Sequence, residues 1–226
     1  MRTTKTQSEA LARSLRDAAT RRFAQDGYAA VALDDLAAEV GATRGAVYHH
    51  FGSKEGLFRA VLTAAHAEVG AAVAAAADAV EDPWEGFVVG CETFVRAALD
   101  DGVRRILLVD GPAVVGLAVW RAADAAGSAR HLAEAVSELR VAGRLNSAVG
   151  PALVPMLSGA LNEAALWIAE AGDREAAVAD SLSLLRIWLA ALRPHSSVSG
   201  QDGRVQAPQS PTARDAAGDP AQERRA

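Results

Sequence analysis

The sequence of 226 residues contains little cysteine, few aromatic residues and no long, strongly apolar run. Its single cysteine, Cys91, excludes a disulfide within one chain and fits a reducing compartment. The N-terminal segment lacks the apolar stretch of a signal peptide. The most apolar stretch, at 113–120, is much too short to cross a bilayer. We therefore expect a cytoplasmic protein with no membrane partner.

A net positive charge is also absent, since the formal net charge is -5. This overall value on its own argues against nucleic acid as a partner. The distribution along the chain reverses that impression, because residues 1–60 carry +2 and the remaining residues carry -7. A mildly basic head on an acidic body is a reason to search the first sixty residues for a nucleic-acid site.

Motifs of catalysis and metal binding are missing as well. There is no glycine-rich phosphate loop, no nucleophile elbow and no cluster of histidine, cysteine and glutamate at metal-ligand spacing. The adjacent His49 and His50 would point about 100° apart on a helix, and no third ligand is near in sequence. We expect no catalytic residues, no metal site and no cofactor, and an enzyme is the weaker alternative.

Helical periodicity is what the sequence does contain, and alanine dominates its composition. Glycines end the first two expected helices, and threonine or serine can cap the next two. These signals predict an all-α fold whose first helices cover 8–26, 33–40 and 43–51, with a fourth from Ser53 to about Val80.

The C-terminal part also reads as helices separated by glycine. Asp82 and Pro83 form a strong helix start, because aspartate suits the N-cap and proline the first helical position. We expect a break at Asp110-Gly111-Pro112. Further helices are expected at roughly 113–125, 128–142, 150–171 and 174–193. Residues 195–226 have almost no large apolar side chains, so we predict a disordered tail.

The segment from Leu33 to Phe51 has the pattern of two helices crossing at a tight turn. Leu36, Val40 and Val47 are spaced to bury between them. Gly41 lies in the turn, where a left-handed backbone costs least. The polar residues then fall on the outer face of the second helix, and a helix of this size fits the major groove of DNA.

The run from Phe23 to Phe58 resembles the TetR family of transcriptional regulators, and the resemblance covers residues 9–70. It is carried by Phe23, Gly27-Tyr28, Leu36-Ala37, Gly41, Gly45-x-x-Tyr48, His50-Phe51 and Lys54-x-x-Leu57-Phe58. It implies an N-terminal three-helix DNA-binding domain at 9–70, with the helix-turn-helix at 33–51. A C-terminal helical domain for ligand sensing and dimerisation would occupy 71–194, where only helix count and general texture are similar.

The resemblance also assigns roles to residues of the DNA-binding segment. It makes Arg44 the candidate for reading base edges, most naturally a guanine. Lys54 would clamp the DNA backbone together with the N-terminal dipole of its helix. Thr43, Tyr48 and His50 would donate to phosphates, His49 could face the groove or the backbone, and Gly45 belongs to the same motif. One departure is Ala32, where family members usually place a serine or threonine cap.

The C-terminal helices carry two further sets of candidates. The first is an effector pocket, with ordinary core packing as the alternative; it comprises Phe87, Cys91, Phe94, Trp120 and Trp167. The second is a dimer interface on the last two helices, where the family places it; it comprises Leu157, Leu161, Leu185 and Trp188. Apolar stripes along those two helices favour an interface, although internal core packing would leave the same pattern.

The sequence thus predicts a homodimer that binds a pseudo-palindromic operator in double-stranded DNA. The expected mode is repression released by an unknown apolar or amphipathic small molecule, because the candidate pocket is mostly apolar. Activation, or regulation without an effector, stays open. A protein-interaction module that has lost DNA binding is another alternative, against which the intact Arg44, Tyr48, His50 and Lys54 argue.

Overall fold

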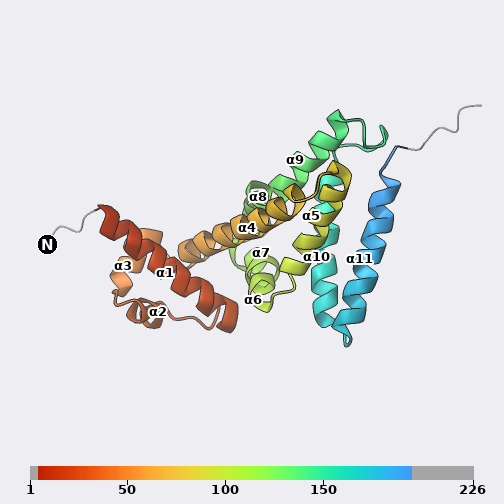
Figure 1. Ribbon diagram of the computed structural model, residues 1–226. Helices are drawn as coiled ribbons and strands as arrows, with labels where there is room; N and C mark the ends of the chain where they lie inside the picture. The colour runs from red at the N-terminus through yellow and green to blue at the C-terminus, as the bar shows by residue number, and fades with distance from the viewer. Residues whose placement is uncertain (1–4, 195–226) are drawn as a thin grey trace, which may run out of the picture. The chain divides into compact units, whose positions relative to one another are not determined.

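The computed structural model describes residues 5–194, and helices account for most of that range (Figure 1). The all-helical fold class is confirmed. The head consists of α1 (Lys5–Asp26), α2 (Leu33–Glu39), α3 (Arg44–Phe51) and the start of α4 (Lys54–Asp78). The body adds α5 (Pro83–Ala97), α6 (Asp101–Arg104), η1 (Arg105–Asp110), α7 (Gly111–Val115), α8 (Leu117–Ala126), α9 (Ser128–Val141), α10 (Leu153–Glu170) and α11 (Arg174–Ala191). The predicted disordered tail at 195–226 lies outside the described residues.

Side-chain caps fix where several helices begin. The hydroxyls of Thr43 and Ser53 accept from main-chain amides in the first turns of α3 and α4. Asp82 accepts from two amides at the start of α5, directly before Pro83. All three caps were predicted from the sequence. Helix α2 lacks such a cap, as the alanine at position 32 predicts, and it relies instead on two aspartates in its first turn.

An aromatic cluster forms the centre of the head. Phe58 of α4 is fully buried, and its ring meets the ring of Phe23 edge-on with centroids 5.3 Å apart. The ring of Tyr28 lies 5.2 Å from Phe58 in a similar arrangement. Such tilted and edge-to-face contacts are the favoured geometry of aromatic pairs. This cluster holds α1 against α4 and so fixes the platform that carries α2 and α3.

Helix α4 belongs to both parts of the molecule. It packs on α1 and α3 near its start and on α5 and α9 further along (Figure 1). Among the described helices it is long and apolar enough to cross a membrane by length and composition alone, which the sequence analysis, in considering only the stretch at 113–120, did not identify. Alanine supplies much of that hydropathy, and the large apolar side chains of α4 lie in the protein core: Leu57, Phe58, Val61, Leu62, Val69 and Val73.

The expected break at Asp110-Gly111-Pro112 was wrong. Helical backbone runs from α6 through the π-helix η1 and directly into α7. Pro112 has no N–H to donate to the preceding turn, and the carbonyl of Leu107, five residues earlier, accepts from the indole of Trp120 instead. The chain breaks instead at Gly116, which has a φ of 77° that other residues rarely adopt.

Two residues of η1 hold the end of α1, and we call Arg105 and Asp110 the α1 clasp. The guanidinium of Arg105 donates to the carbonyls of Ala24 (3.0 Å) and Gln25 (2.5 Å). The carboxylate of Asp110 accepts from the amide of Tyr28 at 2.8 Å. A π-helix bonds residues five apart, which is the spacing of this pair. The clasp therefore attaches the head to the body beside α4.

A buried polar network crosses the body. The hydroxyl of Ser128 donates to Asp124 at 2.9 Å and lies 3.0 Å from Nδ1 of His66. The hydroxyl of Ser158 donates to the second carboxylate oxygen of Asp124 at 3.0 Å. Burial lowers the pKa of His66, although the nearby Asp124 carboxylate acts in the opposite direction. The network thus ties α4 to α8, α9 and α10.

Candidate DNA interface and ligand cavity

The turn between α2 and α3 has the geometry that the sequence predicted. Leu36, Ala37 and Val47 are almost completely buried between the helices. Gly41 takes a φ of 67° in the turn, and the amide of Ala42 donates back to the carbonyl of Ala37 at 2.8 Å. This tight connection leaves the outer face of α3 exposed, which is the face available to a DNA groove.

Arg44 is the first residue of α3 and lies exposed on this face. Its guanidinium forms an ion pair with Asp34 at 3.0 Å and a hydrogen bond to the hydroxyl of Tyr48 at 3.3 Å. It also stacks on the Tyr48 ring, 5.5 Å from the centroid. The bond to Tyr48, then the charge of Asp34, raise the pKa of Arg44. The guanidinium is thus charged and oriented in the free protein.

Asp34 makes a contact on this face that the sequence analysis did not predict. Its carboxylate lies on α2 and pairs with Arg44 in the free protein. The signal in the sequence was an acidic pair in the first turn of α2, which equally serves the helix dipole. Binding of DNA would exchange this exposed ion pair for a base or phosphate contact, and exposed pairs of this kind contribute little to stability.

The remaining residues proposed for α3 have different neighbours. The Thr43 hydroxyl accepts from the amide of Ala46 at 3.3 Å, and its own proton stays available for donation. A Cβ at Gly45 would lie 3.7 Å from that hydroxyl oxygen. Tyr48 and His49 are exposed, whereas His50 is half-buried, with its ring centroid 6.2 Å from that of Phe51. The described residues contain no group of three side chains suited to hold a metal ion.

Lys54 begins α4 beside the capping residue Ser53. Its ammonium lies 4.5 Å above the ring of Tyr28 and donates to the carbonyl of Ala29 at 3.3 Å. Partial burial lowers the pKa of this lysine. The arrangement presents a cation together with the N-terminus of α4, and both attract phosphate.

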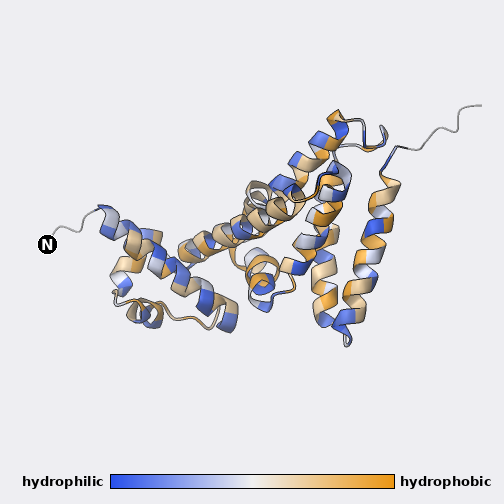
Figure 2. Cartoon of the chain, in the orientation of Figure 1, coloured by the Kyte–Doolittle hydropathy of each residue, from blue (hydrophilic) through white to orange (hydrophobic). Residues whose placement is uncertain are grey.

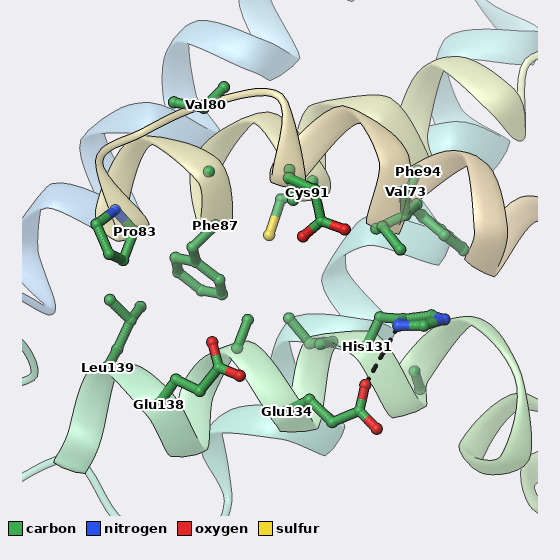
Figure 3. Close-up of a pocket in the computed structure, with 18 of the residues that line it drawn as sticks. Val73, Val80, Pro83, Phe87, Cys91, Phe94, His131, Glu134, Glu138 and Leu139 are labelled. Atoms are coloured by element: carbon green, nitrogen blue, oxygen red, sulfur yellow. Dashed lines mark ion pairs between the residues drawn. The ribbon is translucent and has the colours of Figure 1, made fainter. Parts of the chain in front are cut away.

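A cavity of about 360 Å³ lies in the body among α4, α5, α9 and α10 (Figure 3). Its inner wall is apolar and includes Phe87, Cys91 and Phe94, all three buried. Gly86 and Gly90 let α5 approach α4, since a Cβ at Gly86 would lie only 3.0 Å from the Ala77 carbonyl oxygen. This volume is in the range of small-molecule sites, which are typically about 300–1,000 Å³.

Three of the five proposed pocket residues meet at this cavity, and two do not. Trp120 donates from its indole nitrogen to the carbonyl of Leu107 at 2.6 Å, away from the cavity lining. Trp167 is half-exposed on α10. Burial, then the nearby charge of Glu92, raise the pKa of Cys91 to about 12. The thiol therefore stays protonated and is a wall of the cavity rather than a reactive group.

The face of α10 and α11 that points away from the body carries large apolar side chains. Figure 2 shows hydrophobic residues recurring along both helices. The exposed members, which we call the outer α10–α11 face, are Met156, Trp167, Leu184, Ile187 and Trp188. Among the proposed interface residues, Trp188 belongs to this face, whereas Leu157, Leu161 and Leu185 are buried inside the chain. Leu161 also lines the cavity.

Comparison with known proteins agrees with this division into head and body. Residues 15–61 match the family model described as bacterial regulatory proteins of the tetR family. Residues 84–192 match the model of a tetracyclin repressor-like C-terminal domain. No curated protein matches the chain significantly.

Solved structures provide a relative over most of the chain. A TetR-family transcriptional regulator from Pectobacterium atrosepticum is 36% identical and superposes with a TM-score of 0.68, covering 84% of this chain and 98% of its own. The fold is also shared with RolR, solved with resorcinol, at 19% identity, a TM-score of 0.64 and coverages of 84% and 94%. The fatty acid degradation regulator FadR from Bacillus halodurans shows the fold at 17% identity, a TM-score of 0.64 and coverages of 82% and 96%.

The helix-turn-helix, the helical body and the relative that covers most of the chain together define a DNA-binding transcriptional regulator. The chain belongs to the TetR family. This is a family of regulators and not of enzymes, as expected from the sequence.

Proposed function

We propose that the protein is a homodimeric repressor that leaves a pseudo-palindromic operator when an apolar or amphipathic small molecule enters the cavity among α4, α5, α9 and α10. We place it in the cytoplasm. The observation that carries the proposal is α4 itself. It begins at Lys54 in the head and ends with Ala77 and Asp78 at the wall of the cavity.

A single helix of 25 residues connects the two sites, over roughly 37 Å at 1.5 Å per residue. A ligand that separates α4 from α5 or α9 would tilt this helix and move the head. Two recognition helices of a dimer must lie about 34–36 Å apart to enter successive major grooves. A ligand that prefers another separation must weaken DNA binding by the same factor by which DNA weakens ligand binding.

The α1 clasp and the buried network would transmit this movement from the body to the head. The network fixes α4 to α8, α9 and α10 through His66, so the middle of α4 is held by the body. The clasp holds the end of α1 with Arg105 and Asp110. A change in the body would therefore reach the head through two attachments, α4 and the clasp, and turn it as one piece.

The outer α10–α11 face supports dimerisation. Leu184, Ile187 and Trp188 are spaced by three and four residues, so they share one side of α11. An apolar face of this extent is typical of an interface rather than of a solvated helix. Two copies related by a two-fold axis would present two recognition helices to a palindromic site.

Substitutions at Arg44 and Lys54 separate base reading from backbone clamping. Operator DNA is first obtained by selecting genomic fragments with the purified protein. Arg44→Ala should weaken operator binding by about 1–3 kcal/mol and reduce discrimination against a mutated half-site, as expected when a base is no longer read. Lys54→Ala should weaken binding to both sequences alike and lower the salt slope by about 0.9 for each phosphate that the lysine no longer neutralises.

The control for these variants is Arg121→Ala, which removes an exposed arginine from α8 in the body. It should leave operator affinity unchanged in the same fluorescence anisotropy titrations. Full operator affinity and discrimination in Arg44→Ala would show that α3 does not read the DNA.

Filling the cavity tests the release mechanism. Ala135 lines the cavity from α9, and Ala135→Phe should occupy part of the space. This variant should keep operator affinity and lose its response to compounds that release the wild-type protein, measured by anisotropy. Equal release of both proteins by the same compound would place the effector site elsewhere.

A further inference from the structure

The charged side chains that line the cavity are mostly acidic. Four carboxylates line it: Asp78 at the end of α4, Glu81 in the following turn, and Glu134 and Glu138 on α9. Neither lysine nor arginine is among the lining residues that the structure describes. Figure 3 shows Glu134 and Glu138 on α9, across the cavity from Phe87 and Cys91. The wall is thus apolar inside and acidic at the mouth.

These carboxylates differ in whether they form ion pairs with basic side chains. Glu134 pairs with Arg130 and His131, each at 3.2 Å. Asp78, Glu81 and Glu138 are exposed and form no ion pair within residues 5–194. Three uncompensated negative charges therefore border the entrance.

The ends of α4 and α5 also contribute to the electrostatic field at the entrance. The C-terminus of α4 borders the cavity through Ala77 and Asp78, and a helix C-terminus carries a partial negative charge. The N-terminus of α5 also borders it and would contribute the opposite sign. Its first amides are already bonded to the Asp82 carboxylate, which offsets that charge.

The inner wall fits the apolar part of such a ligand. Phe87 and Phe94 are packed in the core and exposed by only 4% and 8%, so the surface that they offer to the apolar part of a ligand is held in place before binding. Leu132 and Leu139 of α9 face them across the space. Aromatic faces also attract cations, and this attraction grows when the cation is desolvated.

We infer that the cavity takes an apolar organic cation, with its hydrophobic body among Phe87, Phe94 and Leu132 and its positive group at Asp78, Glu81 and Glu138. This inference rests on the proposed function, since it specifies the ligand class of the same cavity. An anionic amphiphile such as a fatty carboxylate meets neither lysine nor arginine in the lining, where His131 already pairs with Glu134, and it faces three negative charges instead.

The test compares three probes of nearly equal size against the full-length protein by isothermal titration calorimetry. They are phenylpropyl-trimethylammonium, its uncharged analogue with a tert-butyl group in place of trimethylammonium, and phenylbutyrate. The cation should bind at least about tenfold more tightly than the uncharged analogue, because opposite charges attract strongly near a protein surface of low dielectric constant. Phenylbutyrate should bind most weakly.

Substitutions assign this preference to the mouth of the cavity. The triple variant Asp78→Asn, Glu81→Gln and Glu138→Gln should bind the cation and the uncharged analogue equally, with affinity for the uncharged analogue unchanged. The control Glu68→Gln removes an exposed carboxylate of α4 that does not line the cavity, and should keep the full preference.

The outcomes separate this inference from the proposed function. Equal or tighter binding of the uncharged or anionic probe, binding of none of the three, or an unchanged preference in the triple variant overturns the cationic ligand class. Release of operator DNA by uncharged compounds would then still support the repressor mechanism. Conversely, cation binding that depends on the three carboxylates but leaves operator affinity unchanged supports the ligand class and contradicts release as the mechanism.

Discussion

Replacing Ile187 and Trp188 together by glutamate should convert the proposed dimer into a monomer. Both side chains are more than half-exposed on the outer α10–α11 face, at 66% and 53%. In an interface they would be buried, and unpaired carboxylates are costly to bury. Sedimentation analysis should show the change in mass, and operator affinity should fall by roughly 10²–10⁴-fold because the two heads no longer bind as one unit.

A matched control places the same charges elsewhere on the body. Leu117→Glu with Val141→Glu also replaces two exposed apolar residues, on α8 and α9. This control should stay dimeric and bind the operator normally. A dimer of unchanged stability in the Ile187→Glu, Trp188→Glu variant would move the interface to another surface.

Truncating Phe58 to alanine should destabilise the head more than any surface change. The ring is fully buried and makes edge-on contacts with Phe23 and Tyr28. Its removal leaves a cavity between α1 and α4 and should cost about 3–5 kcal/mol. The effect should be largest in the head, where the ring is lost; the buried apolar side chains of head and body form one continuous core, which α4 joins.

Hydrogen exchange followed by mass spectrometry can locate this destabilisation. Amides of residues 15–61 should exchange much faster in Phe58→Ala, while those of 84–192 keep most of their protection and operator binding is abolished. Phe58→Leu conserves most of the volume and should cost less than about 1.5 kcal/mol. Uniformly faster exchange over head and body would mean that the two unfold as one cooperative unit.

The head was predictable from its sequence because its signals are local. Gly41 in the turn, the Thr43 and Ser53 caps and the small Ala37 are each required by backbone geometry at one position. The start of α5 at Asp82 and Pro83 was predicted for the same reason. Local chemistry of this kind does not depend on what the rest of the chain packs against.

The body was less predictable because its features depend on tertiary packing. The periodic spacing of apolar residues predicts a buried face on α10 and on α11. It does not show whether that face packs in the protomer's own core or against a partner protomer. Leu157 and Leu185 therefore look like interface residues in the sequence, although they are buried within the chain. Leu184 and Ile187 carry the exposed side of α11, and the same pattern gave no reason to choose them.

The cavity and the π-helix could not be predicted from the sequence for the same reason. Tryptophan is a common pocket residue, but the sequence does not reveal that the Trp120 indole is bonded to the Leu107 carbonyl. The charged mouth comes from residues 78, 81, 134 and 138, which only the packing of α9 on α4 and α5 brings together. Gly111 and Pro112 resemble a break because π-helical backbone before them has no clear sequence signature.

The α1 clasp has a consequence for how such a protein can diversify. Every atom that Arg105 and Asp110 hold in the head belongs to the main chain: the carbonyls of residues 24 and 25 and the amide of residue 28. The bonds of the clasp therefore depend only on the path of the backbone, and the exposed side chains of α3 can change without altering them. Substitutions that change the preference for DNA are thus compatible with the same attachment to the body.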